Sequence, residues 1–359
     1  LYCVYLPLLR YAKNRKRRRN IRMEDSRIYL LTGAAGFLGN NIARQLVEKG
    51  CRVRGLVLKG DKAVKHIPEG VEIVYGDLTD KTSLENFFDV EKEQLVCIHC
   101  ASIVYLKEEP SELVYRVNVE GTQNIIDFCL EKNVEKLVYV SSTGTVAELP
   151  HGEFMREPEK FDLDKIVGYY GKTKAMATQL VFDAVKEKGL KACVVYPTGI
   201  CGPNDYAGGP VSTFIEQYCN GGNKVGFPGS FNSVDVRDLA AGTIAAVDKG
   251  RIGEGYILGN DVVWMKDMFA YISHASGVKM TKIILPMPLT RIIVKVSETI
   301  GRLTNKAPLI TELMLYNLVR NNAYDSSKAK KELGYQTRPF ADTIYDEVEW
   351  LKEEHRVSA

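Results

Sequence analysis

The sequence predicts an α/β protein with a doubly wound parallel sheet and a smaller, partly helical C-terminal region. Short runs rich in Val and Ile alternate with segments of helical periodicity through the first half of the chain, which is typical of βαβ units. A glycine-rich turn over residues 32–39 separates the first expected strand from the first expected helix. These two observations indicate a Rossmann-type sheet, in which right-handed crossovers place ligands at the carboxyl ends of the strands.

The expected elements follow one another closely along the first half of the chain. We expect strands over residues 27–31, 52–58, 71–75, 95–100, 136–140 and 191–195, and helices over 40–49, 117–132 and 170–188. We assign residues 27–200 to a first domain, to which 232–262 return. Gly and Pro punctuate residues 202–230, which favours a loop, and 281–320 is unusually apolar. Residues 201–231 and 263–352 are expected to form a substrate-binding region over the carboxyl edge of the sheet.

The charge of the chain is unevenly distributed. The net charge is +3, but residues 1–22 hold eight Lys and Arg and no acid, so the remainder carries −5. A mildly acidic body does not favour nucleic acid as a partner. No stretch approaches the roughly 18–20 apolar residues that a membrane span needs, so we expect no spanning segment.

Residues 1–22 are expected to lie outside the fold, as a leader or a disordered basic extension. We expect Met23 to be the native start, because Arg18 and Arg19 can be encoded by AGG-AGG, a ribosome-binding sequence. A basic anchor at a membrane surface is the alternative.

The eight cysteines are scattered without the spacing of a metal site, apart from Cys97 and Cys100. These two lie in an apolar run that resembles a buried strand, where an odd separation points side chains to opposite faces. We therefore predict reduced structural thiols, no metal, and a cytoplasmic protein.

The turn over residues 32–39 has the chemistry of a phosphate-binding loop. Gly33 allows the tight turn, Gly36 lets a pyrophosphate approach the backbone, and Gly39 allows the helix to pack closely on the strand. Phe37 and Leu38 are the turn residues just before the helix, whose free N–H groups and positive dipole end attract phosphate. A purely structural turn is the alternative, but the position between a strand and a helix favours a dinucleotide.

The end of the second strand bears on the choice between NAD and NADP. An acid there would accept the ribose hydroxyls of NAD, whereas a cation would meet the 2′-phosphate of NADP. Lys59 follows this strand and no acid lies at its end, which favours NADP. Asp61 nearby, and the reading of Lys59 as an ordinary loop residue, leave NAD open.

Tyr170 and Lys174 have the spacing that puts two side chains on one face of a helix. A tyrosine hydroxyl with a pKa of about 10 is a poor base at neutral pH. A neighbouring ammonium favours the phenolate and assists proton exchange with a carbonyl or carbinol. Tyr324 and Lys328 share the spacing, but only Tyr170 follows a strand, over 137–143, that ends in hydroxyl residues.

Together with the G-x-x-G-x-x-G turn, these motifs resemble those of extended short-chain dehydrogenases/reductases, over roughly residues 27–352. The resemblance implies that Asp77 and Leu78 contact the adenine and that Ala101 and Ser102, after His99, lie near the cofactor. It also implies that the segment with Pro197 and Ile200 lines the nicotinamide. Tyr196 replaces the arginine usual in that segment, and the motif from Asp235 to Asp238 completes the set.

The same resemblance calls for a hydroxyl that binds the substrate oxygen. Ser142 and Thr143 are both candidates. The reductases of the family point to Ser142, and a one-residue shift in alignment gives Thr143. Asn118 matches the family asparagine near the active site, although a helix N-cap would explain it as well.

Three functions are compatible with this scaffold. The first is an NADP-dependent reductase or dehydrogenase of a bulky, largely apolar ketone, aldehyde or alcohol, which resembles the dihydroflavonol-reductase and 3β-hydroxysteroid-dehydrogenase branch. The second is an NAD-dependent nucleotide-sugar epimerase or dehydratase, disfavoured because Phe231 stands where such enzymes carry a phosphate-binding arginine. The third is a non-catalytic nucleotide sensor, disfavoured because such proteins tend to lose the Tyr/Lys pair. Many relatives pair through helices flanking the tyrosine helix, so a homodimer is the candidate assembly.

Overall fold

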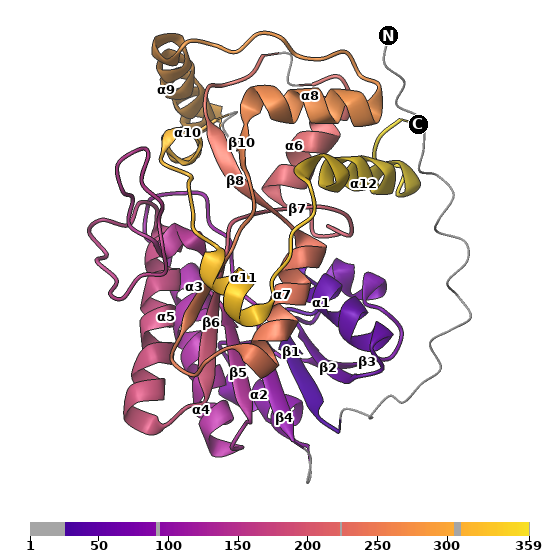
Figure 1. The fold of residues 1–359 in the computed structure, drawn as a ribbon, viewed down its shortest axis with the longest axis vertical. Coiled ribbons are helices and arrows are strands. Elements are labelled where there is room, and N and C mark those ends of the chain that lie inside the picture. The colour runs from indigo at the N-terminus through magenta and orange to yellow at the C-terminus, as the bar shows by residue number, and fades with distance from the viewer. Residues whose placement is uncertain (1–25, 91–93, 223–224, 305–309, 359) are drawn as a thin grey trace.

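The computed structural model describes residues 26–90, 94–222, 225–304 and 310–358. The predicted leader, residues 1–22, lies outside the described residues. The described chain forms a large parallel sheet with helices on both faces, and a smaller group of strands and helices lies beyond one end of this sheet (Figure 1). The predicted α/β class and the Rossmann-type sheet are confirmed.

The large sheet has seven strands, which are all parallel to their neighbours. Its spatial order is β3 (Val71–Tyr75), β2 (Arg52–Val57), β1 (Ile28–Thr32), β4 (Leu95–His99), β5 (Lys136–Val140), β6 (Ala192–Pro197) and β9 (Gly255–Leu258). The order reverses between β1 and β4, and this reversal defines the crevice where ligands bind in doubly wound sheets.

Alternation along the strands builds a separate core on each face of the sheet. In β1, Tyr29 and Leu31 face one core while Ile28 and Leu30 face the other. The first core is covered by α1 (Phe37–Glu48), α7 (Val236–Lys249) and α11 (Ser327–Leu333). The second is covered by α2 (Lys81–Phe88), α4 (Gly121–Glu131) and α5 (Tyr169–Lys188). Because both faces are covered, the central strands β1, β4, β5 and β6 are buried throughout and mostly apolar, as the Val- and Ile-rich runs predicted.

The smaller group contains a three-stranded sheet and the remaining long helices. Its strands are β7 (Gly199–Cys201), β8 (Ser230–Asp235) and β10 (Val262–Trp264), in the order β10-β8-β7. Its helices are α6 (Pro210–Cys219), α8 (Met265–Ser276), α9 (Met287–Thr304), α10 (Glu312–Val319) and α12 (Phe340–Glu353). The exact division into domains remains a prediction, although β9 does return to the large sheet.

Two expected elements differ from the structure. The segment 202–230, expected to be a loop, contains α6, because Gly209 and Pro210 begin a helix there instead of breaking one: Pro210 occupies its first turn. The helix expected over 117–132 begins earlier, at α3 (Glu112–Tyr115), and continues through a wider π-helical turn (Arg116–Glu120) into α4.

The cysteine geometry follows the prediction. Cys97 packs in one core and Cys100 against the other, so the two thiols lie on opposite faces of the sheet. Within the described residues, Cys97, Cys100, Cys129, Cys193, Cys201 and Cys219 are free thiols. Among the described helices, none is long and apolar enough to cross a bilayer.

Candidate active site

The glycine turn lies between β1 and α1 at the carboxyl edge of the sheet. Gly33 has a φ of 71°, in the left-handed region that favours glycine. A side chain at Gly39 would overlap the Gly33 carbonyl oxygen, so only glycine allows α1 to approach the strand this closely. These two glycines have the roles that the sequence predicted for them.

The start of α1 is suited to an anion. Gly36 precedes the helix, no side chain caps the first turn, and that turn holds no acid. A Cβ built on Gly36 would meet only the Gly33 carbonyl oxygen, at 3.2 Å, so the outer side of the turn is open. Phe37 and Leu38 pack against the core, so the groups they offer to a phosphate are backbone N–H groups. This cradle fits the pyrophosphate of a dinucleotide.

The other predicted cofactor residues follow neighbouring strands along the same edge. Lys59 lies exposed just after β2. Asp77 follows β3, where its carboxylate accepts hydrogen bonds from the backbone N–H and the hydroxyl of Thr79. Leu78 is buried in the core under α4. The structure thus brings these residues to one edge, while their contacts with a cofactor remain predictions.

A buried network links β1 to β4 beneath the turn. The Thr32 hydroxyl oxygen accepts hydrogen bonds from the backbone N–H groups of Cys100 and Ala101, both at 3.1 Å. The same hydroxyl lies 2.6 Å from Nδ1 of His99, whose Nε2 lies 3.1 Å from the Thr122 hydroxyl. Burial, with the nearby charge of Lys174, lowers the pKa of His99 to about 3, so this imidazole stays neutral. The sequence marked His99 as part of a motif but gave no sign of its partner Thr32.

Tyr170 lies in the first turn of α5, against the loop that follows β5. Gly171 allows this approach, because a Cβ there would come within 2.6 Å of the Gly144 carbonyl oxygen. The Tyr170 side chain lies close to the hydroxyls of Ser142 and Ser102. Burial raises the pKa of Tyr170, and these two nearby hydroxyls partly oppose that rise.

Lys174 lies one turn further along α5 and is buried. Its Nζ donates a hydrogen bond to the Val140 carbonyl oxygen at 2.6 Å and lies 4.4 Å from the centre of the Tyr139 ring. Burial lowers the pKa of Lys174 to about 7. The ammonium is therefore held at the end of β5 by a carbonyl oxygen and an aromatic face, and it titrates near neutral pH.

Ser142 and Thr143 face different groups. The Ser142 oxygen accepts a hydrogen bond from the Gly144 N–H at 3.0 Å and lies close to the Tyr170 side chain. The Thr143 hydroxyl instead donates to the Pro197 carbonyl oxygen at 3.0 Å and lies close to the Tyr324 side chain. Of the two candidates, the geometry brings Ser142 to the Tyr170 hydroxyl.

Asn118 does not cap a helix, because it lies inside the continuous helical run from α3 to α4. Its amide oxygen accepts from the Ile103 N–H at 2.8 Å, and its amide nitrogen donates to the Ile103 carbonyl oxygen at 3.0 Å. The same nitrogen donates to the Thr173 hydroxyl at 3.1 Å. Asn118 thereby ties the loop after β4, which carries Ser102, to the helix that carries Tyr170.

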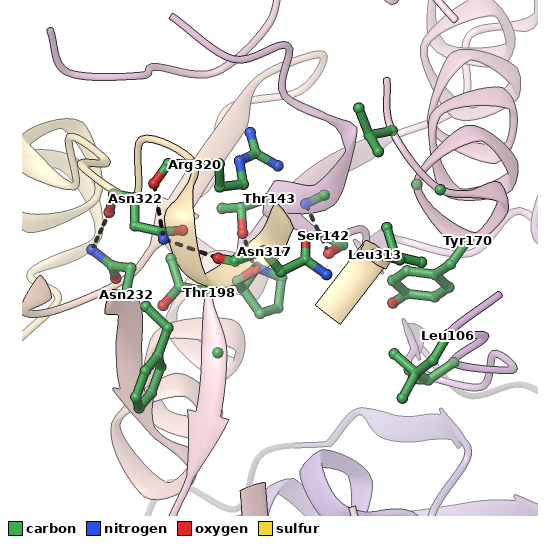
Figure 2. A pocket seen from close by; sticks show the side chains of 18 of the residues that line it. Leu106, Ser142, Thr143, Tyr170, Thr198, Asn232, Leu313, Asn317, Arg320 and Asn322 are labelled. Atoms are coloured by element: carbon green, nitrogen blue, oxygen red, sulfur yellow. Dashed lines mark hydrogen bonds between the residues drawn. The ribbon is translucent and has the colours of Figure 1, made fainter. Parts of the chain in front are cut away.

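A cavity of about 270 Å³ opens beside Tyr170 and Ser142. Figure 2 shows Tyr170, Leu106 and Leu313 on one side of it and Asn232 and Asn322 on the other. The apolar lining consists of Val104, Tyr105, Leu106, Val167, Phe231 and Leu313. The polar lining includes Thr198, Asn232, Asn317, Arg320 and Asn322. Pro197 also lines the cavity, whereas Ile200 on β7 packs against the core.

Most of these lining residues were absent from the sequence-based site. They come from the loop after β4 and from α10 with the segment that follows it, far apart in the chain. Only the apolar character of residues 281–320 pointed to this region.

Tyr324 lines the same cavity, yet it does not form a second Tyr/Lys pair. It precedes α11, and Lys328 on that helix pairs instead with Glu254 at 2.7 Å. The sequence preference for Tyr170 over Tyr324 thus has a structural basis: only Tyr170 shares a helix with its lysine.

The sequence model of the NAD dependent epimerase/dehydratase family matches residues 29–259. A putative dihydroflavonol 4-reductase from Synechocystis sp. is 27% identical over 333 residues, covering 90% of this chain and 94% of that protein. A ketoreductase from Stigmatella aurantiaca, named for 4-hydroxy-2-methyl-3-oxo-4-farnesyl-3,4-dihydroquinoline-1-oxide, is 27% identical and covers 86% and 91%. The crystal structure of gox2253 superposes with a TM-score of 0.80 at 32% identity, covering 93% of this chain and all of that one.

The chain is thus an NAD(P)-dependent enzyme of the extended short-chain dehydrogenase/reductase type and belongs to the NAD-dependent epimerase/dehydratase family. Members of this family bind a nicotinamide cofactor and act on small molecules. The resemblance inferred from the motifs is confirmed.

Proposed function

We propose that this enzyme uses NADP to reduce a ketone or aldehyde of a bulky, largely apolar substrate, or to oxidise the corresponding alcohol. The observation that carries the proposal is the position of the Tyr170 hydroxyl. It lies close to the hydroxyls of Ser142 and Ser102 and beside a cavity that apolar side chains partly line. A carbonyl bound in this cavity would meet two hydroxyl donors at once.

Each residue of the centre has a chemical task in this proposal. Because burial raises its pKa, Tyr170 stays protonated at neutral pH and can donate a proton to the carbonyl oxygen. The Ser142 hydroxyl donates a hydrogen bond to the same carbonyl oxygen and so keeps that oxygen beside the Tyr170 hydroxyl. The charge of Lys174, a turn away, stabilises the phenolate left after proton transfer. The bound nicotinamide supplies the hydride.

One feature supports NADP. Lys59 is exposed two residues after β2, close to where the 2′-phosphate would lie, and β2 ends without an acid.

The substrate class rests on the cavity and on the relatives. Six apolar side chains line the cavity near Tyr170. The Stigmatella relative is named as a ketoreductase of a farnesyl-bearing quinoline oxide, and the Synechocystis relative as a reductase of a dihydroflavonol. Both names describe bulky carbonyl compounds with large apolar parts.

One observation favours the alternative of a nucleotide-sugar epimerase. Arg320 lines the cavity and could contact a diphosphate, although its Nη2 already donates to the Val146 carbonyl oxygen at 3.2 Å. Phe231, at the position of the epimerase arginine, lines the same cavity and offers no charge.

The test begins with the purified enzyme and no substrate. We would measure thermal stabilisation by NADPH and by NADH separately, and look for NAD released from a denatured sample. We expect stronger stabilisation by NADPH and no retained cofactor, followed by NADPH consumption with apolar ketones. Copurified NAD with no preference for NADPH, together with turnover of nucleotide sugars, would contradict the proposal.

A further inference from the structure

Helix α9 has its most apolar face turned outward. Leu289, Ile292, Val296, Ile300 and Leu303 recur every three or four residues, which places them in one stripe. These five residues are between 42% and 82% exposed. The opposite side holds the only two fully buried residues of the helix, Thr290 and Val294. A surface helix normally turns its apolar face toward the core. An exposed apolar stripe of this kind therefore indicates a surface that binds another molecule.

Three cations lie beside the stripe. Arg291, Lys295 and Arg302 are exposed, and their spacings of four and seven residues bring them to the same side of the helix. None of these three cations forms an ion pair with another residue in the described part of the chain. The single acid of the helix, Glu298, is already engaged, because its carboxylate accepts a hydrogen bond from the Glu312 N–H at 2.9 Å. The exposed edge of α9 is therefore cationic.

An apolar stripe flanked by Arg and Lys is the pattern of a helix that lies in the plane of a membrane surface. We propose that α9 docks this enzyme onto an anionic lipid bilayer, with the stripe in the headgroup and acyl boundary and the cations on the lipid phosphates. Charge complementarity selects this occupant over a second copy of the chain, whose α9 would bring the same three cations into contact. The stripe runs over 15 residues, from Leu289 to Leu303, which is about 21 Å along the helix axis.

The position of α9 leaves it free to dock. It stands at the outer edge of the molecule, beside α10 and away from the seven-stranded sheet (Figure 1). Its inner side shares a small separate core with α10, formed by Val294, Ile310 and Leu315. Leu313, on the same helix α10, lines the active-site cavity. Docking would thus bring one wall of the cavity close to the lipid, where apolar molecules accumulate; this consequence, unlike docking itself, rests on the proposed function.

The test is flotation of the full chain with vesicles, either of phosphatidylcholine alone or of phosphatidylcholine mixed with phosphatidylglycerol. The first variant combines Ile292→Gln, Val296→Gln and Ile300→Gln, which removes apolar surface and leaves every charge in place. Its control combines Ile252→Gln, Val262→Gln and Tyr345→Gln, which are exposed apolar positions outside α9. The second variant combines Arg291→Gln, Lys295→Gln and Arg302→Gln, with Lys266→Gln, Lys330→Gln and Lys331→Gln as the control of equal charge.

We expect the unmodified chain to bind the anionic vesicles more tightly than the neutral ones. The apolar variant should bind at least about tenfold more weakly, and the charge variant should lose up to about fivefold for each cation removed. Both controls should bind like the unmodified chain, because their substitutions lie outside α9. Flotation of the apolar variant equal to that of the unmodified chain overturns the proposal. So does a dimer, seen by light scattering, that the apolar variant loses while vesicle binding stays unchanged, because the stripe would then be an interface between copies.

Discussion

Tyr170, Ser142 and Lys174 meet because three local features coincide at the end of β5. The strand delivers Ser142, the glycine at 171 lets α5 approach it, and the Val140 carbonyl oxygen holds the lysine. The sequence predicted Tyr170 and Lys174 from their spacing on one helix. It left Ser142 and Thr143 open, because neighbouring residues in an extended segment point in opposite directions and the alignment was uncertain by one position.

The different surroundings of Ser142 and Thr143 predict different effects when each hydroxyl is removed. Ser142→Ala should lower kcat by about 10²–10³-fold, because it removes a donor to the substrate oxygen. Thr143→Val should lose much less activity but about 1 kcal/mol of stability, since its hydroxyl ties β5 to the Pro197 carbonyl oxygen. Steady-state kinetics and thermal unfolding of both variants check this. A larger kinetic loss for Thr143→Val than for Ser142→Ala would assign the role to Thr143.

At the scale of elements, the turn before α1 shows what the spacing of its glycines can predict and what it cannot. The sequence could not separate a phosphate-binding turn from a purely structural one. The structure assigns different constraints to its glycines: Gly39 has no room for a Cβ, whereas Gly36 has an open outer side.

This difference predicts opposite outcomes for two alanine substitutions. Gly39→Ala should destabilise the protein without cofactor by more than about 2 kcal/mol, because the new methyl group overlaps the Gly33 carbonyl oxygen. Gly36→Ala should leave the melting temperature of the cofactor-free protein nearly unchanged but abolish stabilisation by NADPH. Thermal unfolding with and without NADPH measures both. Normal stabilisation of Gly36→Ala by NADPH would mean that the turn does not bind the pyrophosphate.

The elements that the sequence missed have physical explanations. The α6 segment was expected to be a loop because it contains Gly and Pro, yet a proline is well tolerated in the first turn of a helix. An N-cap was the alternative interpretation of Asn118, because asparagine favours that position, but its tertiary hydrogen bonds join Ile103 and Thr173 to a site inside a helix. Such contacts join residues far apart in the chain and leave no local pattern.

At the scale of the whole molecule, the parallel, doubly wound class of the sheet followed from the alternation of strands and helices, but the packing of the C-terminal helices did not. Helix α12 is fixed partly by Glu347, whose carboxylate accepts a hydrogen bond from the Gly202 N–H at 2.7 Å, just after β7. This acid is fully buried, and burial raises its pKa to about 8. Nothing in the sequence around Glu347 distinguishes it from the exposed acids of the same helix. The homodimer implied by the family remains a prediction.

The buried acid predicts how stability depends on pH. Between the ordinary pKa of about 4.5 and the folded value of about 8, the folded protein keeps a proton that the unfolded chain releases. Glu347 therefore contributes a fall in stability as pH rises through this window, at most about 1.4 kcal/mol per pH unit. Glu347→Gln keeps an acceptor for Gly202 and should remove that fall. Melting temperatures of both proteins from pH 5 to 8 test this, and parallel curves would show that Glu347 does not titrate there.

The central claim is that Tyr170 donates the proton, and the cavity supplies its own control because Tyr324 also lines it. The most direct measurement is NADPH consumption with an apolar ketone by the Tyr170→Phe and Tyr324→Phe variants, alongside thermal stabilisation of each by NADPH. We predict that Tyr170→Phe loses at least about 10²-fold in kcat while still being stabilised by NADPH, and that Tyr324→Phe keeps most of its kcat. Turnover by Tyr170→Phe close to that of the unmodified enzyme would contradict the account.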